Sequence, residues 1–298
     1  MIEGVEHRSL TVRDGTRIGY QVRGDRGPAV VLANGLGGTY VAFEHLYDVL
    51  GDYRVLCWDY RGLYASGPAA DPRANTVAHQ VADLVELLDH EGIDRCVVVG
   101  WSMGVQVAFE LTRDHAERVA GIFAINGTAG RAFHTVMSSR HLKRVIPAML
   151  RIIKAQASLV GRATQVVAGT DATLIAMKKL GMVAPSADLD VFRVVAAGFK
   201  TIDWAIYADL LARLDEHDAS DVLAAVNVPT TIITGDRDII TPPATAENLH
   251  RRVPGSRLVH IDGGSHYTPV EFPAVLQDEL ARLLARVPGW AAAERDAG

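Results

Sequence analysis

Short apolar runs rich in β-branched residues alternate with longer amphipathic stretches through the first half of the chain. The apolar runs predict strands at residues 8–13, 16–23, 29–33, 53–58, 95–100 and 119–125. Between them, apolar residues spaced three and four positions apart predict helices over 75–91 and 102–114. Asp14-Gly15, between the first two runs, is typical of a hairpin turn. This alternation indicates an α/β fold, with helices covering a mostly parallel sheet.

The alternation stops near residue 130 and resumes after residue 225. Residues 130–225 carry helical patterns and predict no strand. Strands and helices then return, at 230–234, 243–252, 258–261 and 272–286. We therefore expect one sheet built in two halves. Residues 1–129 and 226–298 would form the core domain, and residues 130–225 a helical cap inserted into it.

Composition narrows the class of protein. Of the 298 residues, 49% are hydrophobic and 22% charged, which is enough to bury a large core. The net charge of -5 argues against nucleic acid as a partner. The polar N-terminus and the lack of a long apolar run predict neither a signal peptide nor a membrane span, so we expect a cytoplasmic protein. Cys57 and Cys96 lie in apolar runs and are expected to be buried thiols; no pattern predicts a metal or an organic cofactor.

Ser102 lies between a β-branched run and a helical pattern, within residues 100–104, Gly-Trp-Ser-Met-Gly. A tight strand-to-helix turn would expose its hydroxyl, and Gly100 and Gly104 would give the turn the clearance it needs. The following helix would point its positive N-terminal end at the same place. The alternative is that Ser102 only caps the helix. The strand and helix around it favour a catalytic nucleophile.

A serine nucleophile needs a histidine base, and the histidine needs a carboxylate to orient it. His266 lies in a glycine-rich loop after a predicted strand, whereas His260 lies inside that strand and is expected to be structural. Asp238 follows the predicted strand at 230–234 and is our candidate acid, with Asp236 assigned to the turn. The chain order of serine, aspartate and histidine is the one expected when an α/β-hydrolase sheet carries the triad.

A glycine-rich loop at residues 34–38, Asn-Gly-Leu-Gly-Gly, follows the strand predicted at 29–33. Its glycines would let backbone N–H groups approach a substrate, so the N–H groups of Leu36 and Met103 are the expected oxyanion donors. A phosphate cradle is the alternative, but the loop lacks the Lys-Ser/Thr of a P-loop and the spacing of a dinucleotide fingerprint.

Together these motifs resemble the α/β-hydrolase superfamily, in the branch of small carboxylesterases, enol-lactonases, monoglyceride lipases and cofactor-free haloperoxidases. The resemblance rests on residues 34–37, 59–62, 100–104, 235–238 and 264–266. It implies an eight-stranded, mostly parallel sheet flanked by helices, with a helical cap inserted. It also implies Ser102 as nucleophile, Asp238 as acid, His266 as base, and Leu36 and Met103 as oxyanion donors.

Two residues depart from the family pattern. Asn34 stands where the oxyanion loop usually begins with histidine, and we expect the loop to form with altered support. Tyr64 replaces the second glycine of the usual Arg-Gly-x-Gly-x-Ser turn, which would reshape the backbone or place an aromatic ring near the site. Trp101 directly precedes Ser102, and in this it resembles the residue before the nucleophile in the carrier-protein methyl ester esterases of biotin synthesis.

The predicted cap supplies the clues to substrate and partners. Its apolar residues imply a hydrophobic acyl pocket, with candidates Met137, Ile146, Met149, Leu150, Ile152, Ile153, Leu159, Phe192, Phe199 and Trp204. Seven basic residues between 131 and 170 (131, 140, 143, 144, 151, 154 and 162) occur without an acidic one. They form either a face in water or paired with acids of the cap (Asp203, Asp209, Asp215, Glu216 and Asp218), or one attracting anionic lipid or an acidic acyl-carrier protein.

We therefore expect a serine hydrolase that cleaves a small-molecule carboxylic ester with a hydrophobic acyl group through an acyl-enzyme, without a cofactor. Three alternatives stay open. The same triad could cleave an amide or a C–C bond, the site could support a cofactor-free peroxidase-like reaction, or the chain could be a non-catalytic binding protein.

Overall fold

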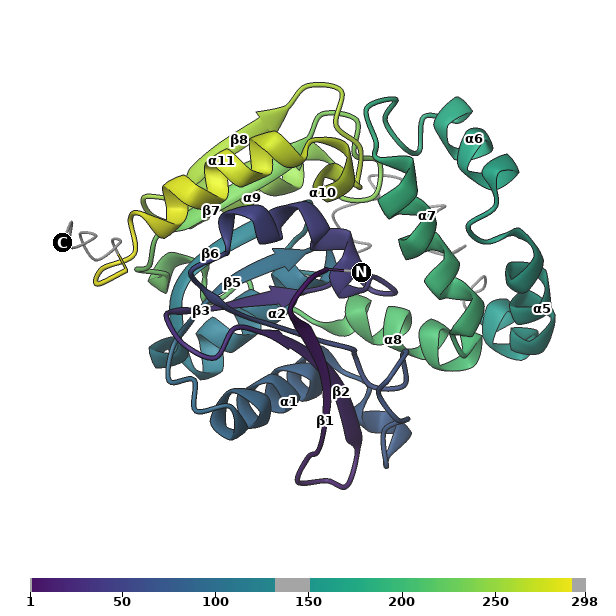
Figure 1. Ribbon diagram of the computed structural model, residues 1–298, viewed down its shortest axis with the longest axis horizontal. Coiled ribbons are helices and arrows are strands. Elements are labelled where there is room, and N and C mark those ends of the chain that lie inside the picture. Colours follow the sequence, from purple (N-terminus) through teal and green to yellow (C-terminus); the bar gives the residue numbers. More distant parts are fainter. Residues whose placement is uncertain (1, 132–150, 291–298) are drawn as a thin grey trace.

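The computed structural model describes residues 2–131 and 151–290, and its centre is an eight-stranded sheet (Figure 1). Along the sheet the order is β1-β2-β4-β3-β5-β6-β7-β8. The strands are β1 (Val5–Thr11), β2 (Arg17–Arg23), β3 (Ala29–Ala33), β4 (Arg54–Trp58), β5 (Cys96–Trp101), β6 (Val119–Ile125), β7 (Thr230–Gly235) and β8 (Arg257–Ile261). β2 pairs antiparallel with β1 and β4, and every other pairing is parallel. The predicted α/β sheet is confirmed.

The hairpin of β1 and β2 turns at Asp14-Gly15, as the sequence indicates. The Asp14 carboxylate accepts the backbone N–H of Thr16 at 2.9 Å, and Gly15 has a φ of 87°, which glycine adopts without strain. The first strand begins at Val5, earlier than predicted, because Val5 pairs with Arg23 at the far end of the hairpin. That part of the strand is largely exposed and lacks an apolar run to mark it.

Helices cover both faces of the sheet, because successive strand residues point to opposite sides. Val31 and Ala33 of β3 pack in one core with α1 (Val77–His90), α2 (Met103–Asp114) and α9 (Pro243–Arg252). Val30 and Leu32 pack in the other core with α11 (Pro273–Leu284) and the 3₁₀ segment η1 (Tyr40–Val49). The short helix α10 spans Thr268–Glu271, and further 3₁₀ turns span Pro72–Ala74, Ala116–Arg118, Phe199–Thr201 and Leu223–Ala225. Both cysteines are free and buried.

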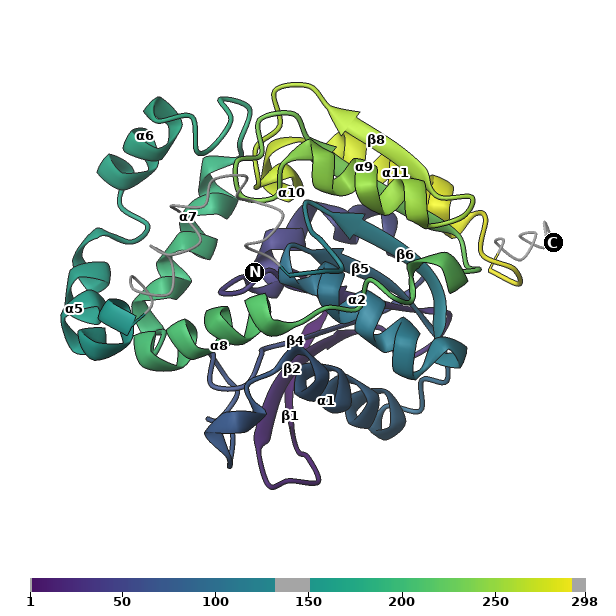
Figure 2. The ribbon, with the colours of Figure 1, turned by 180° about the vertical axis from the view of Figure 1, so that it is seen from behind.

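Between β6 and β7 the described residues form helices and no strand. The helices are α5 (Ala157–Val167), α6 (Asp171–Lys179), α7 (Leu189–Gly198) and α8 (Trp204–Glu216). Figures 1 and 2 show them beyond the carboxyl ends of the parallel strands, on the side where the turns after β3, β5, β7 and β8 lie. Because β6 and β7 are neighbours in the sheet, the chain leaves and re-enters the core at one place. We call the described residues 151–217 the inserted helices.

Hydrogen bonds tie this segment to α2, the helix that follows Ser102. The Gln106 side-chain amide donates to the carbonyl oxygens of Gly130, at 2.9 Å, and Leu214, at 3.2 Å. Gln106 therefore joins the outgoing and the returning chain. Of the basic residues noted in the sequence, Lys154 pairs with Asp209 at 3.0 Å, and residues 140, 143 and 144 lie outside the described part. None of the helices in the described residues has the length and apolar character needed to cross a membrane.

Candidate active site

Ser102 sits in a sharp turn between β5 and α2, with a backbone φ of 55° and ψ of -111°. Non-glycine residues rarely adopt such angles, so the surrounding structure must impose them. A Cβ atom on Gly100 would lie 2.4 Å from the Gly104 carbonyl oxygen, and one on Gly104 would lie 2.0 Å from that of Ala33. Both glycines are therefore required by close backbone approach, which accounts for the sequence pattern around Ser102.

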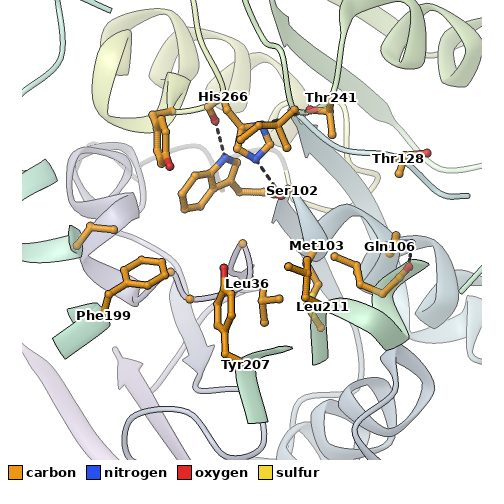
Figure 3. Close-up of a pocket in the computed structure, with 18 residues that line it drawn as sticks. Leu36, Ser102, Met103, Gln106, Thr128, Phe199, Tyr207, Leu211, Thr241 and His266 are labelled. Carbon is orange, nitrogen blue, oxygen red and sulfur yellow. Dashed lines mark hydrogen bonds between the residues drawn. The ribbon is translucent and has the colours of Figure 1, made fainter. Parts of the chain in front are cut away.

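The structure brings Ser102, His266 and Asp238 together, although they come from three different strand ends. The Nε2 atom of His266, after β8, is 2.9 Å from the Oγ atom of Ser102. The Nδ1 atom of His266 is 2.8 Å from Oδ2 of Asp238, after β7. An ionised carboxylate can only accept, so Nδ1 carries the proton and Nε2 is left to accept from the serine hydroxyl. Figure 3 shows His266 directly above Ser102.

Asp238 is held in its ionised form. Burial alone would raise the pKa of its carboxyl, but hydrogen bonds from His266 and Thr241 outweigh burial, and the pKa falls below its ordinary value. Its Oδ1 atom accepts the backbone N–H groups of Ile240 and Thr241, both at 2.8 Å, and its Oδ2 atom accepts the Thr241 hydroxyl at 2.7 Å. Asp236, the other acid of this turn, is exposed to solvent.

The expected oxyanion donors, Leu36 and Met103, both line the cavity beside Ser102. Neither backbone N–H donates a hydrogen bond to any group within residues 2–131 and 151–290. By contrast, the N–H of Ser102 itself is occupied, because it donates to the carbonyl oxygen of Ile125 at 2.9 Å. Two unused donors next to a hydroxyl are the arrangement that stabilises a developing oxyanion.

Asn126 and Trp101 support the histidine and the aspartate, and the sequence reasoning missed both roles. Asn126, directly after β6, donates from Nδ2 to the Asp238 carboxylate at 2.7 Å and to the Ser265 carbonyl oxygen at 3.2 Å. The indole N–H of Trp101 donates to the carbonyl oxygen of His266 at 2.8 Å. Position gave a signal for Asn126, since it follows a central strand at the edge that carries the site. Nothing in the sequence marks the partner of Trp101.

A cavity of about 290 Å³ opens onto Ser102, between the strand ends and the inserted helices (Figure 3). Its wall is mainly apolar, with Leu36 and Met103 from the core and Val195, Phe199, Tyr207, Leu211 and Leu214 from the inserted segment. Within the described residues, no group of three or more histidine, cysteine or carboxylate side chains could hold a metal ion.

Of the residues expected to form an acyl pocket, Phe199 lines the cavity and Trp204 packs against it with a ring-centroid distance of 6.1 Å. Ile152 and Leu159 do not: their side chains are exposed on the outer surface. Phe192 is buried in a separate apolar cluster among the inserted helices. The sequence shows which residues of these helices are apolar, but it does not show which face of each helix lies toward the cavity. Met137, Ile146, Met149 and Leu150 lie outside the described residues.

Comparison with known proteins agrees with this geometry. A protein from Escherichia coli O7:K1 named "Putative carbamate hydrolase RutD" is 27% identical over 265 residues, which cover 86% of this chain and 92% of that protein. An esterase structure from Thermogutta terrifontis superposes with a TM-score of 0.73 at 21% identity, covering 95% of this chain and 99% of that one. The enol-lactonase from Burkholderia xenovorans LB400 gives 0.73 at 23% identity, covering 93% and 100%. At these identities the two structures show a shared fold.

The model of the Alpha/beta hydrolase family matches residues 30–279. That span takes in the turns that carry Ser102, Asp238 and His266, as well as the loop at 34–38. This chain therefore belongs to the alpha/beta hydrolase family.

Proposed function

We propose that this protein hydrolyses a carboxylic ester with an apolar acyl group through an acyl-enzyme on Ser102. One observation carries the proposal: the Ser102 hydroxyl, hydrogen-bonded to His266, faces an apolar cavity beside two backbone N–H groups that have no partner among the described residues. A hydroxyl is a weak nucleophile unless a base takes its proton as it attacks. The oriented imidazole supplies that base.

In the first half of the proposed reaction, the Ser102 oxygen attacks the ester carbonyl while its proton moves to Nε2 of His266. The carbonyl oxygen becomes negative and accepts hydrogen bonds from the N–H groups of Leu36 and Met103. The C–O bond to the alcohol then breaks, and His266 gives its proton to the departing alkoxide. Asp238 stabilises the positive imidazole throughout and itself stays ionised.

In the second half, water enters where the alcohol left and loses a proton to Nε2 of His266. The resulting hydroxide attacks the acyl carbonyl, and the oxyanion forms again between the same two donors. Collapse of this intermediate releases the carboxylic acid, and the proton returns from His266 to the Ser102 oxygen. In each half His266 first accepts a proton as a base and then donates it as an acid, so a single histidine is sufficient.

A carbamate or an amide would present its carbonyl carbon to the same groups, and two relatives that are 27% and 26% identical to this chain are named "Putative carbamate hydrolase RutD". The wall of the cavity favours the ester of an apolar acid, because most of its exposed surface is apolar. C–C cleavage and non-catalytic binding remain the competing functions.

A fluorophosphonate probe tests the serine mechanism, because it forms a covalent bond only with an activated hydroxyl. We expect labelling of the wild-type protein and none of Ser102→Ala. Ser256 is a matched control, since its hydroxyl also lies 2.9 Å from a histidine, Nδ1 of His250, but away from the cavity. Ser256→Ala should label like wild type. A folded wild-type protein that does not label would overturn the proposed hydrolase and favour a binding protein.

A panel of p-nitrophenyl esters of graded chain length, with an N-alkyl carbamate and an anilide of matched size, tests the bond and the acyl group. We expect the highest kcat/KM for a medium-length ester. Turnover of the carbamate or the anilide in preference to the ester would replace the proposed bond while keeping the mechanism.

A further inference from the structure

Two tyrosine hydroxyls hold the loop that carries the Leu36 N–H. Both come from the turn after β4. The Tyr60 hydroxyl donates to the carbonyl oxygen of Asn34 at 2.6 Å, and the Tyr64 hydroxyl donates to that of Gly37. The two anchors thus lie on either side of Leu36. Burial raises the pKa of both phenols, so both remain protonated donors at neutral pH.

Tyr64 makes its contact from an unusual backbone conformation. Its φ is 50°, in the left-handed region that glycine favours and bulky residues avoid. The family pattern has glycine here, so the chain keeps the glycine-like backbone but adds a side chain. Such strain persists only where surrounding contacts over-determine it, and it is frequently found at functional sites.

The Tyr64 ring packs closely against Gly198 of the inserted helices. A Cβ atom on Gly198, at the end of α7, would lie 3.2 Å from the Tyr64 hydroxyl oxygen. The next residue, Phe199, packs on Gly37, whose carbonyl oxygen accepts the Tyr64 hydroxyl. A Cβ atom on Gly37 would lie 2.7 Å from the Phe199 ring. Gly37 is therefore enclosed between Tyr64 of the core and Phe199 of the inserted segment.

We infer that Tyr64 is a positioning residue for the oxyanion hole: its hydroxyl fixes the Gly37 carbonyl and so keeps the Leu36 N–H directed at the cavity. Tyr60 fixes the start of the loop, and the Gly38 N–H closes it by donating to the Gly35 carbonyl oxygen at 2.8 Å. Without Tyr64 the far end of the loop has lost its side-chain anchor. This inference rests on the proposed function, because an oxyanion donor matters only if an oxyanion forms.

Tyr64→Phe removes the hydroxyl and keeps the ring. Tyr20→Phe is the matched control, because the Tyr20 hydroxyl also makes one hydrogen bond, to Glu91 at 2.6 Å, but does not line the cavity. We expect Tyr64→Phe to lower kcat about tenfold with KM within about twofold, since a loosened donor weakens transition-state binding more than substrate binding. Tyr20→Phe should leave both constants within about twofold of wild type.

The affinity for a trifluoromethyl ketone separates positioning from general loosening. This inhibitor forms a tetrahedral adduct with the serine and places an oxyanion between the donors, so its Ki should rise by the same factor as kcat falls. A Tyr64→Phe variant with unchanged kcat and Ki would overturn the inference. Equal losses in Tyr64→Phe and Tyr20→Phe would also overturn it, by showing a general effect of stability.

Tyr64→Gly guards against a folding artefact, because it relieves the strained backbone while removing the hydroxyl. We expect a loss of kcat at least as large as in Tyr64→Phe. The thermal unfolding midpoint should stay near that of wild type, so that unfolding does not explain the loss. Full activity in Tyr64→Gly would refute the role. The rate of fluorophosphonate labelling reports on the same donors without ester turnover. A labelled wild type whose rate Tyr64→Phe does not change therefore refutes the inference alone, whereas an unlabelled wild type refutes the proposed function and with it the inference.

Discussion

Asp59, directly after β4, is a buried carboxylate that weakens the fold at neutral pH. Only 4% of the residue is exposed, and burial raises its pKa from 3.8 to about 6. The backbone N–H of Ala65, at 3.1 Å, and the Gln21 side-chain amide, at 3.4 Å, offset this cost only in part. In Asp59→Asn the amide oxygen can accept both of these hydrogen bonds without burying a charge, so we expect this substitution to stabilise the protein.

The size and pH dependence follow from the pKa. Between pH 3.8 and about 6 the folded chain holds a proton that the unfolded chain has lost, so the free energy of unfolding falls as pH rises through this range. A difference of about two units corresponds to about 3 kcal/mol. Asparagine carries no charge at any pH. The variant should therefore gain about 3 kcal/mol over wild type near pH 8 but only about 1 kcal/mol near pH 4.5.

Urea unfolding followed by tryptophan fluorescence at the two pH values measures this difference. Contributions from other titrating groups cancel when the variant is compared with wild type at each pH. Asp25→Asn is the control, because the Asp25 side chain is 87% exposed, and it should stay within about 0.5 kcal/mol of wild type at both pH values. A stabilisation that is the same at both pH values, or a loss of stability at pH 8, would refute the reasoning.

Three further substitutions test the geometry of the site. Gly104→Ala should destabilise the protein by about 3 kcal/mol or more in urea unfolding, because its Cβ would lie 2.0 Å from the Ala33 carbonyl oxygen; wild-type stability would contradict the close approach. Trp101→Phe keeps a ring but loses the hydrogen bond to His266, so kcat should fall about three- to tenfold, and an unchanged kcat would show that the bond does not position the base. Phe199→Ala enlarges the cavity and should raise kcat/KM for long esters relative to short ones; an unaltered chain-length profile would place the acyl group elsewhere.

The sequence predicted the sheet well, because burial on both faces leaves a clear trace. β3, for instance, is five consecutive apolar residues, and its observed bounds are the predicted ones. The 3₁₀ segment η1 was not predicted. Its buried residues, Ala42, Phe43, Leu46 and Tyr47, recur at helical spacing, so the sequence carried a signal for this segment that the prediction did not use.

The candidate site was predictable for the residues that directly follow a strand. Ser102, Asp238 and His266 each occupy a turn after an apolar run, and parallel strands bring such turns to a common edge. The anchors of the oxyanion loop were not predictable in this way. The hydroxyl of Tyr64 reaches Gly37, a residue 27 positions away, and a side-chain hydrogen bond of this kind leaves no periodic trace in the sequence.

The order of the site residues along the chain has a consequence for synthesis. The turn that carries Ser102 is complete when residue 104 has been made, but Asp238 and His266 follow β7 and β8, after the whole inserted segment. A nascent chain that has folded only β1 to β6 carries a serine without a base. Under the proposed mechanism, hydrolysis begins only after the C-terminal strands have added to the sheet, so the appearance of activity in a translation reaction would report the docking of β8.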